Sequence, residues 1–287
     1  MTKSLATMRF PHYERIRLQR AKSIAERLLE SDQSLLIGHR GYSAIAPENT
    51  LPSFQLALDA GAKLVELDYH QSLDGVPMVI HDRILDRTTN ARRKWKRRRI
   101  KVSNKTAAEI QTLDAGTWFD GKFSGAKVPT LTEALDLICG GGAVPVIEHK
   151  SGDARTLADL LHQRKLVNRV VVISFNWRFL RELHALIPEQ VLGALGPPAR
   201  LSNGRRPLHP RRQLSSRLKD LLMTGARIAV WNRKISKRSI EAAHRRGVKT
   251  WIYTVDDARL AKRLVARGAQ AIIANQVERI HKALFPL

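Results

Sequence analysis

The chain has 287 residues, of which 43% are hydrophobic and 26% charged, a balance typical of a folded globular protein and not of a disordered one. A single cysteine, Cys139, excludes an internal disulfide framework and a cysteine-rich metal site. The 50 Lys and Arg residues against 26 Asp and Glu give a formal net charge of +24. This charge favours nucleic acid, an acidic membrane surface or a phosphate-bearing substrate as partner, although basic residues used only for solubility would give the same balance.

The sequence contains no membrane-spanning pattern. No apolar run approaches the roughly 18 residues that cross a bilayer. The first thirty residues are polar and contain arginine, without the apolar core of a secretory signal. We therefore expect a cytoplasmic protein, with peripheral contact to a membrane as the alternative that the charge leaves open.

Predicted strands and helices alternate along the chain. Residues 11–30 repeat their apolar positions every three or four residues, which predicts an N-terminal helix. Short apolar runs then predict nine strands, whose Val- and Ile-rich composition is typical of parallel strands buried on both faces. These runs are 35–39, 64–68, 76–82, 144–149, 170–175, 191–195, 227–231, 250–255 and 271–274. Helices between them include one that stops at Gly61 and one that runs from a cap at Ser236 to Gly247.

This alternation predicts an α/β fold, a (β/α)8 TIM-type barrel with an N-terminal helix. Nine strands are one too many for such a barrel, and the link from Asp68 to Val76 is too short for a parallel crossover. We therefore expect an irregular barrel with one peripheral or split strand. The predicted domains are an N-terminal helical extension, residues 1–34, and a catalytic barrel, residues 35–287.

Two segments depart from the pattern. Residues 92–101 carry eight Lys or Arg in ten positions and are predicted to form a basic loop. Residues 196–213 contain four of the twelve prolines and are predicted to be an extended loop.

Four consecutive predicted strands end in charged or titratable side chains. They are His39 and Arg40, Glu66 and Asp68, His81 and Asp82, and Glu148 and Lys150. Functional residues of α/β barrels lie at the carboxyl ends of the strands, so we expect this set to surround one site. A lone histidine or carboxylate there is more often structural, but buried strands have no structural use for so many charges at one end.

The residue types in this set predict phosphate chemistry. Glu66 and Asp68 are two apart and face the same side of a strand, where Glu148 can join them around a hard cation such as Mg²⁺ or Ca²⁺. Such a cation binds phosphate oxygens and offsets their charge. His39 and His81 are suited to act as acid and base near neutral pH, in either order. Arg40 and Lys150 are expected to bind the remaining phosphate oxygens; they are the predicted substrate-binding cations.

The segment from His39 to Asn90 resembles the signature of the glycerophosphodiester phosphodiesterase family: HRG, PENT, ExD, DG with a proline, HD and LxRTT in order. Residues 113–135 and the IEHK sequence at 147–150 resemble its next blocks. SFN and WIYTV resemble its later strands, so the similarity covers roughly residues 35–280. After the last strand the family usually has Asp-Pro, where this chain has IIANQVERI.

The resemblance implies hydrolysis of a small anionic glycerophosphodiester to glycerol phosphate and an alcohol. It implies a divalent cation, Mg²⁺ or Ca²⁺, at the three acids, and an acid–base pair formed by the two histidines. Arg40 and Lys150 would bind phosphate, and Trp251 would line the glycerol or alcohol pocket. Glu48 and Asn49 of PENT are expected to brace the loop around His39.

Other functions remain open at this stage. A lysophospholipase D or phospholipase D-like activity on anionic lipids would use the same histidines and acids. A basic nucleic-acid-binding protein is a further alternative, but it would not need a complete catalytic set, so no specific nucleic acid is expected. The basic segment 92–101, with Trp95 in it, would steer anionic headgroups or contact an acidic membrane, unless it is only a solvated loop. The oligomeric state is left open.

Overall fold

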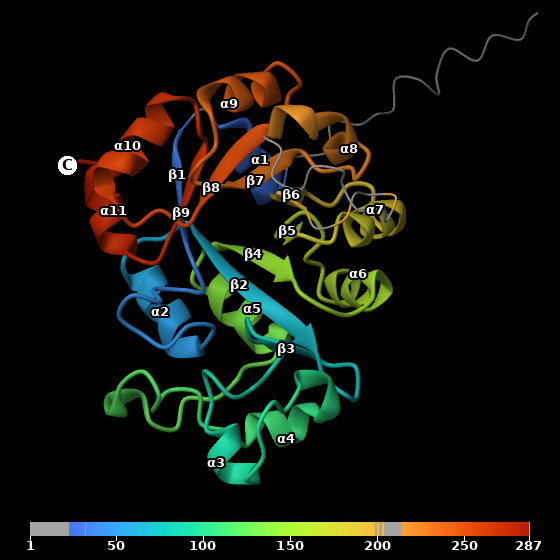
Figure 1. Cartoon of the computed structure of the whole chain (residues 1–287), viewed down its shortest axis with the longest axis vertical. Coiled ribbons are helices and arrows are strands. Elements are labelled where there is room, and N and C mark those ends of the chain that lie inside the picture. The colour runs from blue at the N-terminus through green and yellow to red at the C-terminus, as the bar shows by residue number, and fades with distance from the viewer. Residues whose placement is uncertain (1–22, 32, 199, 201–202, 204–213, 287) are drawn as a thin grey trace, which may run out of the picture.

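The computed structural model of the chain describes residues 23–31, 33–198, 200, 203 and 214–286. In this part of the chain eight parallel strands close into a barrel with helices around it (Figure 1). The strands are β1 (Leu35–Gly38), β2 (Leu64–Gln71), β4 (Val144–His149), β5 (Val171–Ser174), β6 (Leu192–Gly196), β7 (Ile228–Asn232), β8 (Lys249–Tyr253) and β9 (Ala271–Ala274). β1 pairs with both β9 and β2, which closes the sheet and confirms the predicted TIM-type barrel.

The extra predicted strand is peripheral, as expected. β3 (Pro77–Val79) pairs antiparallel with the far end of β2, where Tyr69 is opposite Val79. This pairing is possible because β2 continues three residues beyond its predicted end at Asp68. An antiparallel pair needs only a short turn, which explains why no helix fits between Asp68 and Val76.

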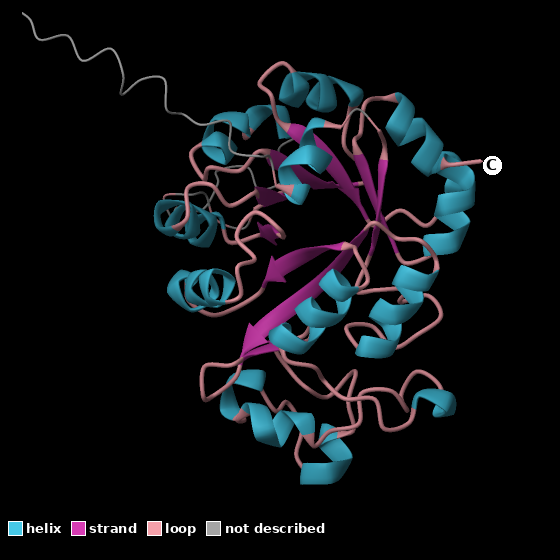
Figure 2. Cartoon of the chain, turned by 180° about the vertical axis from the view of Figure 1, so that it is seen from behind, coloured by secondary structure: helices cyan, strands magenta, loops and turns pink. Residues whose placement is uncertain are grey.

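Helices cover the outside of the barrel (Figure 2). Most of them begin at a side chain that caps the first turn. Thr130 forms a capping box with Glu133, and Ser236 caps its helix as predicted. The outer helices are α2 (Leu51–Asp59), α5 (Leu131–Gly140), α6 (Ala154–Gln163), α7 (Trp177–Leu186), α8 (Leu218–Leu222), α9 (Lys237–His244), α10 (Ala258–Ala266) and α11 (Val277–Leu284).

The chain between β3 and α5 forms an excursion beside the barrel, seen below β3 in Figure 1. Its short helices are α3 (Ala91–Trp95), η1 (Val102–Asn104), α4 (Ala107–Gln111) and η2 (Gly121–Phe123). The excursion has a small apolar core, in which Ile100 and Val102 pack with Leu85 and Leu113. The basic segment 92–101 is therefore not a loop throughout, because it begins inside α3 and anchors Ile100 in this core.

The interior of the barrel is filled by side chains from all eight strands and is closed at its amino-terminal end by α1 (Ile24–Glu30). Ala25 and Leu29 of α1 pack with Leu35 and Leu64, the first residues of β1 and β2. The side-chain amide of Gln270, just before β9, donates to three backbone carbonyls in and after α1. The division into residues 1–34 and 35–287 stays a prediction.

Two predicted segments lie partly outside the described residues. The helix predicted at 11–30 is described only from residue 23, and α1 accounts for that part. Most of the loop predicted at 196–213 also lies outside them. Among the described helices, none has the length and apolar character to cross a bilayer.

Candidate active site

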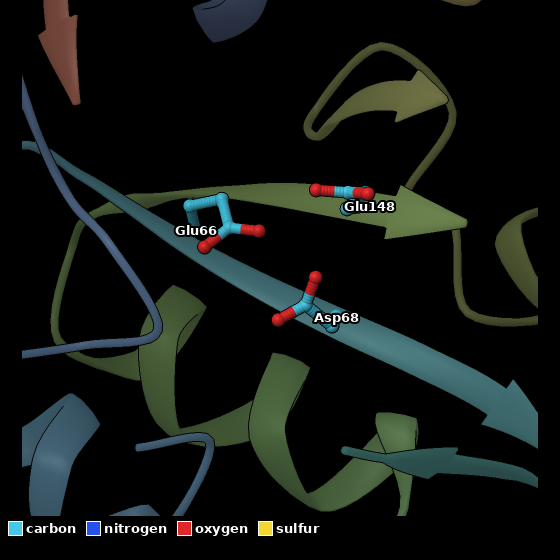
Figure 3. A group of neighbouring side chains, drawn as sticks. All are labelled: Glu66, Asp68 and Glu148. Carbon is cyan, nitrogen blue, oxygen red and sulfur yellow. The ribbon is translucent and has the colours of Figure 1, made fainter. Parts of the chain in front are cut away.

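Three carboxylates from the neighbouring strands β2 and β4 lie close together (Figure 3). Asp68 and Glu148 are direct neighbours in the register of these strands, and Glu66 lies two positions before Asp68 on the same face. One oxygen from each of the three lies within 4.8 Å of the others. The fold therefore brings the three predicted metal ligands together.

All three carboxylates are buried, so their mutual repulsion is poorly screened. Burial, together with the charges of Asp68 and Glu148, raises the pKa of Glu66 well above its ordinary value. Burial and the charge of Asp68 also raise the pKa of Glu148 to about 7. Oε1 of Glu66 has no hydrogen-bond partner among the described residues. A buried, unpartnered oxygen amid repelling carboxylates fits a hard divalent cation, which prefers oxygen ligands.

Two cationic side chains flank this cluster. Arg40 Nε lies 3.2 Å from Asp68 Oδ2, and the Arg40 backbone N–H donates to Glu66 Oε2 at 2.9 Å. Lys150 Nζ lies 3.0 Å from Asp68 Oδ1 and donates to Glu148. Burial alone would raise the pKa of Asp68 and lower that of Lys150. These ion pairs outweigh burial, so the pKa of Asp68 lies below its ordinary value and that of Lys150 lies above. Asp68 and Lys150 are therefore charged at neutral pH.

A tight turn after β1 aims His39 and Arg40 at the carboxylates. Arg40 and Gly41 both have left-handed backbone, with φ of 55° and 86°. A Cβ on Gly41 would lie 2.4 Å from Oγ of Ser53 and 2.6 Å from its backbone carbonyl, so only glycine fits. Ser53 Oγ in turn donates to the Arg40 carbonyl at 2.9 Å. Within the HRG sequence, Gly41 is thus the residue that this turn requires.

The PENT segment braces the site, as expected. Asn49 Nδ2 donates to Asp68 Oδ2 at 2.8 Å, and the Asp68 N–H donates to Asn49 Oδ1 at 3.1 Å. The Asn49 N–H donates to the Arg40 carbonyl, so Asn49 ties the turn after β1 to β2. Glu48 accepts from Arg40 at 2.8 Å and from Arg87 at 2.7 Å.

His39 is held by the loop that follows β9. Its Nδ1 lies 2.7 Å from Oδ1 of Asn275, which also accepts from Ser43 Oγ at 2.9 Å. Asn275 Nδ2 donates to Asp256, which fixes the end of the amide that faces His39. An amide oxygen only accepts, so Nδ1 of His39 carries the hydrogen and Nε2, 4.0 Å from Glu66 Oε2, keeps its lone pair. Burial lowers the pKa of His39 to about 4, so the ring is neutral at pH 7.

His81 lies after β3, within a chain of charged groups. Its Nδ1 is 2.7 Å from Oδ1 of Asp82, and Arg87 Nε donates to Oδ2 of Asp82 at 2.7 Å. The hydrogen bond from Arg87 lowers the pKa of Asp82 to about 2, so this carboxylate stays ionised. Burial lowers the pKa of His81, while the charges of Asp68 and Asp82 oppose that change.

These groups line one pocket of about 300 Å³ at the carboxyl end of the barrel. One side is polar and is formed by His39, Arg40, Glu66, His81, Glu148 and Lys150. The other side is formed mostly by apolar and aromatic side chains: Ile173, Phe175, Leu195, Tyr253, Thr254 and Ile273. A phosphate next to a less polar alcohol matches this division.

Trp251 is placed differently from its predicted position. Its side chain is 1% exposed and packs inside the barrel, with Nε1 donating to Gln270 at 3.1 Å. Tyr253 lies two positions later on the same face of β8 and lines the pocket instead, stacked edge-to-face on Phe175. The prediction for Trp251 was therefore wrong. The next residue on the same face, Tyr253 at the end of β8, lines the pocket because the pocket lies at that end of the strand.

Three supporting residues were not singled out from the sequence. Asn275 and Asp256 hold His39, and Phe175 lines the pocket. The departure from Asp-Pro at IIANQVERI was the only signal for Asn275. Phe175 was the last residue of a predicted strand, but a phenylalanine there has no distinguishing chemistry.

A (β/α)8 barrel with three carboxylates, two histidines and two cations around one pocket defines a phosphodiesterase-type enzyme. Residues 39–279 match the model of the glycerophosphoryl diester phosphodiesterase family, and the chain belongs to this family. It is therefore a phosphoric diester hydrolase.

Individual relatives agree with this assignment. The chain is 31% identical over 252 residues to a glycerophosphodiester phosphodiesterase of Caldanaerobacter subterraneus, covering 86% of this chain and 96% of that one. The crystal structure of a glycerophosphodiester phosphodiesterase from Agrobacterium tumefaciens has a TM-score of 0.71 at 30% identity, over 86% of this chain and 99% of the other. An Oleispira antarctica phosphodiesterase in complex with its product sn-glycerol-3-phosphate has a TM-score of 0.76 at 27% identity, over 89% and 98%.

Proposed function

We propose that the protein hydrolyses small glycerophosphodiesters to glycerol phosphate and an alcohol, with a divalent cation held by Glu66, Asp68 and Glu148. The observation that carries the proposal is the buried carboxylate cluster beside two histidines, in a chain of this family. The product named in the Oleispira structure, sn-glycerol-3-phosphate, supports the same substrate class.

The cluster fits Mg²⁺ or Ca²⁺ because all three donors are carboxylate oxygens. When bound there, the cation supplies Lewis-acid stabilisation of the charge that develops on the phosphate. Arg40 and Lys150 line the same side of the pocket and bind the other phosphate oxygens. The apolar side holds the alcohol.

We assign the base to His39 and the acid to His81. Asn275 leaves the lone pair on Nε2 of His39, so this nitrogen accepts the proton of the attacking hydroxyl, from water or from the neighbouring glycerol oxygen. Asp82 is ionised and contacts Nδ1 of His81, so it stabilises the protonated ring that delivers a proton to the leaving alkoxide.

Release of glycerol phosphate from a panel of glycerophosphodiesters tests the proposal, with EDTA or with added Mg²⁺, Ca²⁺ or Mn²⁺. The expected result is metal-dependent release that His39→Ala and Glu148→Gln both abolish, while each variant keeps the thermal unfolding of a folded protein. Release that persists in EDTA, or that survives both substitutions, would overturn the proposed site.

Lysophospholipids are the second candidate substrates. Ile173, Phe175, Leu195 and Ile273 form an apolar side to the pocket, and Phe175 is partly exposed at its edge, where an acyl chain would lie. The same panel with lysophospholipids added separates the candidates by their kcat/KM.

A further inference from the structure

The excursion beside the barrel contains a second hollow, here called the basic hollow. Its volume is about 410 Å³, and it is lined by Trp95, Arg97, Arg98, Arg99, Ile100, Asn104 and Lys105. It shares no lining residue with the catalytic pocket. Four of its seven lining residues are cationic and none is acidic, so its wall attracts anions.

The backbone of this segment is held in one conformation. The N–H groups of Arg99 and Ile100 both donate to the carboxylate of Asp86, at 2.7 and 3.3 Å. Ile84 pairs with Lys101 across this turn. Lys96 and Arg99 have left-handed backbone, with φ of 51° and 58°, a conformation that costs free energy in residues other than glycine. The arginines are therefore displayed by a defined turn and not by a solvated loop.

The charges of the three arginines are not neutralised locally. No side chain of Arg97, Arg98 or Arg99 forms an ion pair with a residue that the structure describes. The nearby carboxylate of Asp86 accepts from backbone N–H groups instead. Lys105 pairs with Glu109 and lies 4.5 Å from the centre of the Trp95 ring, which fixes the indole as a wall. Three unpaired guanidinium groups around a hollow are suited to phosphate oxygens.

A large aliphatic side chain stands beside the basic hollow. Leu73 is 63% exposed, and its backbone N–H donates to the carbonyl of Lys105 at 2.8 Å. An exposed leucine next to unpaired arginines and a tryptophan combines apolar insertion with attraction to anionic headgroups, the two features of interfacial membrane binding. Nucleic acid would use the arginines but has no need of the leucine.

We propose that the basic hollow and Leu73 form a binding surface for an acidic lipid bilayer, with the arginines on lipid phosphates and Leu73 inserted among the acyl chains. The net charge of +24 adds a long-range attraction of the protein toward an acidic bilayer. This proposal concerns binding alone, so it stands or falls independently of the proposed catalytic function.

Cosedimentation of the full chain with vesicles tests the proposal, using phosphatidylcholine alone and phosphatidylcholine with one-third phosphatidylglycerol. The test variant is Arg97→Ser/Arg98→Ser/Arg99→Asn, with asparagine at the left-handed position because it tolerates that backbone. The matched control, Arg238→Ser/Arg245→Ser/Arg246→Ser, removes the same charge from exposed positions on and after α9. Leu73→Ser tests the apolar contact, and thermal unfolding checks that each variant is folded.

We expect binding only to the acidic vesicles. Each basic residue at such a surface contributes roughly fivefold, so the test variant should lose more than tenfold in partition coefficient. The factor by which the partition coefficient falls in the control variant should be less than a third of the factor in the test variant. Leu73→Ser should weaken binding several-fold. Equal losses in test and control variants, or unchanged binding in the test variant, would overturn the proposal.

Two further measurements test whether the basic hollow binds a different ligand. If inorganic phosphate at matched ionic strength displaces the protein from vesicles and saturates at low concentration, the hollow is a site for a free phosphate and the membrane proposal fails. If the test variant loses binding to a short DNA duplex but not to acidic vesicles, the surface is one for nucleic acid and the proposal also fails.

Discussion

Oδ1 of Asn275 lies 2.7 Å from Nδ1 of His39, although the two residues are 236 positions apart in the chain. Asp256 holds the other end of the amide through Nδ2, so Asn275 cannot turn its nitrogen toward the ring without losing that bond. The loop after β9 thereby selects one tautomer of His39. The neutral amide does this without adding a negative charge at Nδ1.

Replacing Asn275 with alanine should lower kcat by roughly 10- to 100-fold, the range typical of groups that orient a catalytic side chain. The KM should change little, since Asn275 does not line the pocket. Steady-state kinetics check this, with Ser43→Ala for comparison: it removes one hydrogen bond to the same oxygen and one to the backbone carbonyl of His39, but leaves the contact of Asn275 with the ring. A loss confined to KM, or an unchanged kcat in Asn275→Ala, would contradict the orienting role.

Asp82→Asn should shift the alkaline limb of the activity profile to lower pH. The Asp82 carboxylate favours the protonated ring of His81, so its removal lowers the pKa of His81 and the acid form is lost earlier as pH rises. The pH dependence of kcat/KM measures the shift. An unchanged alkaline limb, or a shift of the acidic limb alone, would show that His81 is not the acid.

The carboxylate cluster makes the metal-free protein sensitive to pH. The pKa of Glu148 is raised to about 7, so the folded state holds a proton that the unfolded state has released, and stability falls as pH rises toward and through 7. Buried histidines with lowered pKa values give the opposite slope, but only below about 6.5, where the unfolded state protonates. The window between pH 6.5 and 8 therefore isolates the acids.

In EDTA at pH 8, Glu148→Gln should melt at least about 2 °C above the wild type, corresponding to roughly 1 kcal/mol in a domain of this size. Added Mg²⁺ or Ca²⁺ should reverse the order, because only the wild type keeps all three ligands. Thermal unfolding with and without metal measures both effects. A wild type that is the more stable of the two in EDTA would argue against repulsion in the cluster.

Gly41→Ala should destabilise the protein by more than about 2 kcal/mol, because the new Cβ meets Ser53 in addition to the left-handed strain. Gly61→Ala is the matched control. Its φ of 80° is similar, but nothing lies within 4 Å of the added carbon, so only the backbone cost of roughly 1 kcal/mol is expected. Chemical denaturation of both variants gives the comparison; equal losses would mean that the contact with Ser53 relaxes freely.

The sequence predicted the barrel because its strands are buried on both faces and read as continuous apolar runs. It predicted the clustered acids and histidines because they lie at the ends of such runs, where a barrel gathers its strand ends. It could not place Trp251 correctly, since a shift of two positions along the same face of β8, from Trp251 to Tyr253, decides between the barrel interior and the pocket. The contact of Asn275 with His39 joins residues 236 positions apart, so no spacing along the chain predicts it.

The packing of α1 against the amino-terminal end of the barrel has a consequence for protein synthesis. α1 precedes the strands against which it packs, and its anchor, Gln270, lies 241 positions after Leu29, next to the interior residues of β9. The barrel itself closes only when β9 pairs with β1. During translation α1 can therefore meet Leu35 and Leu64 early, but it lacks Gln270 and the interior of β9 until some 241 further residues have been made, so chaperone capture of the nascent chain should include α1.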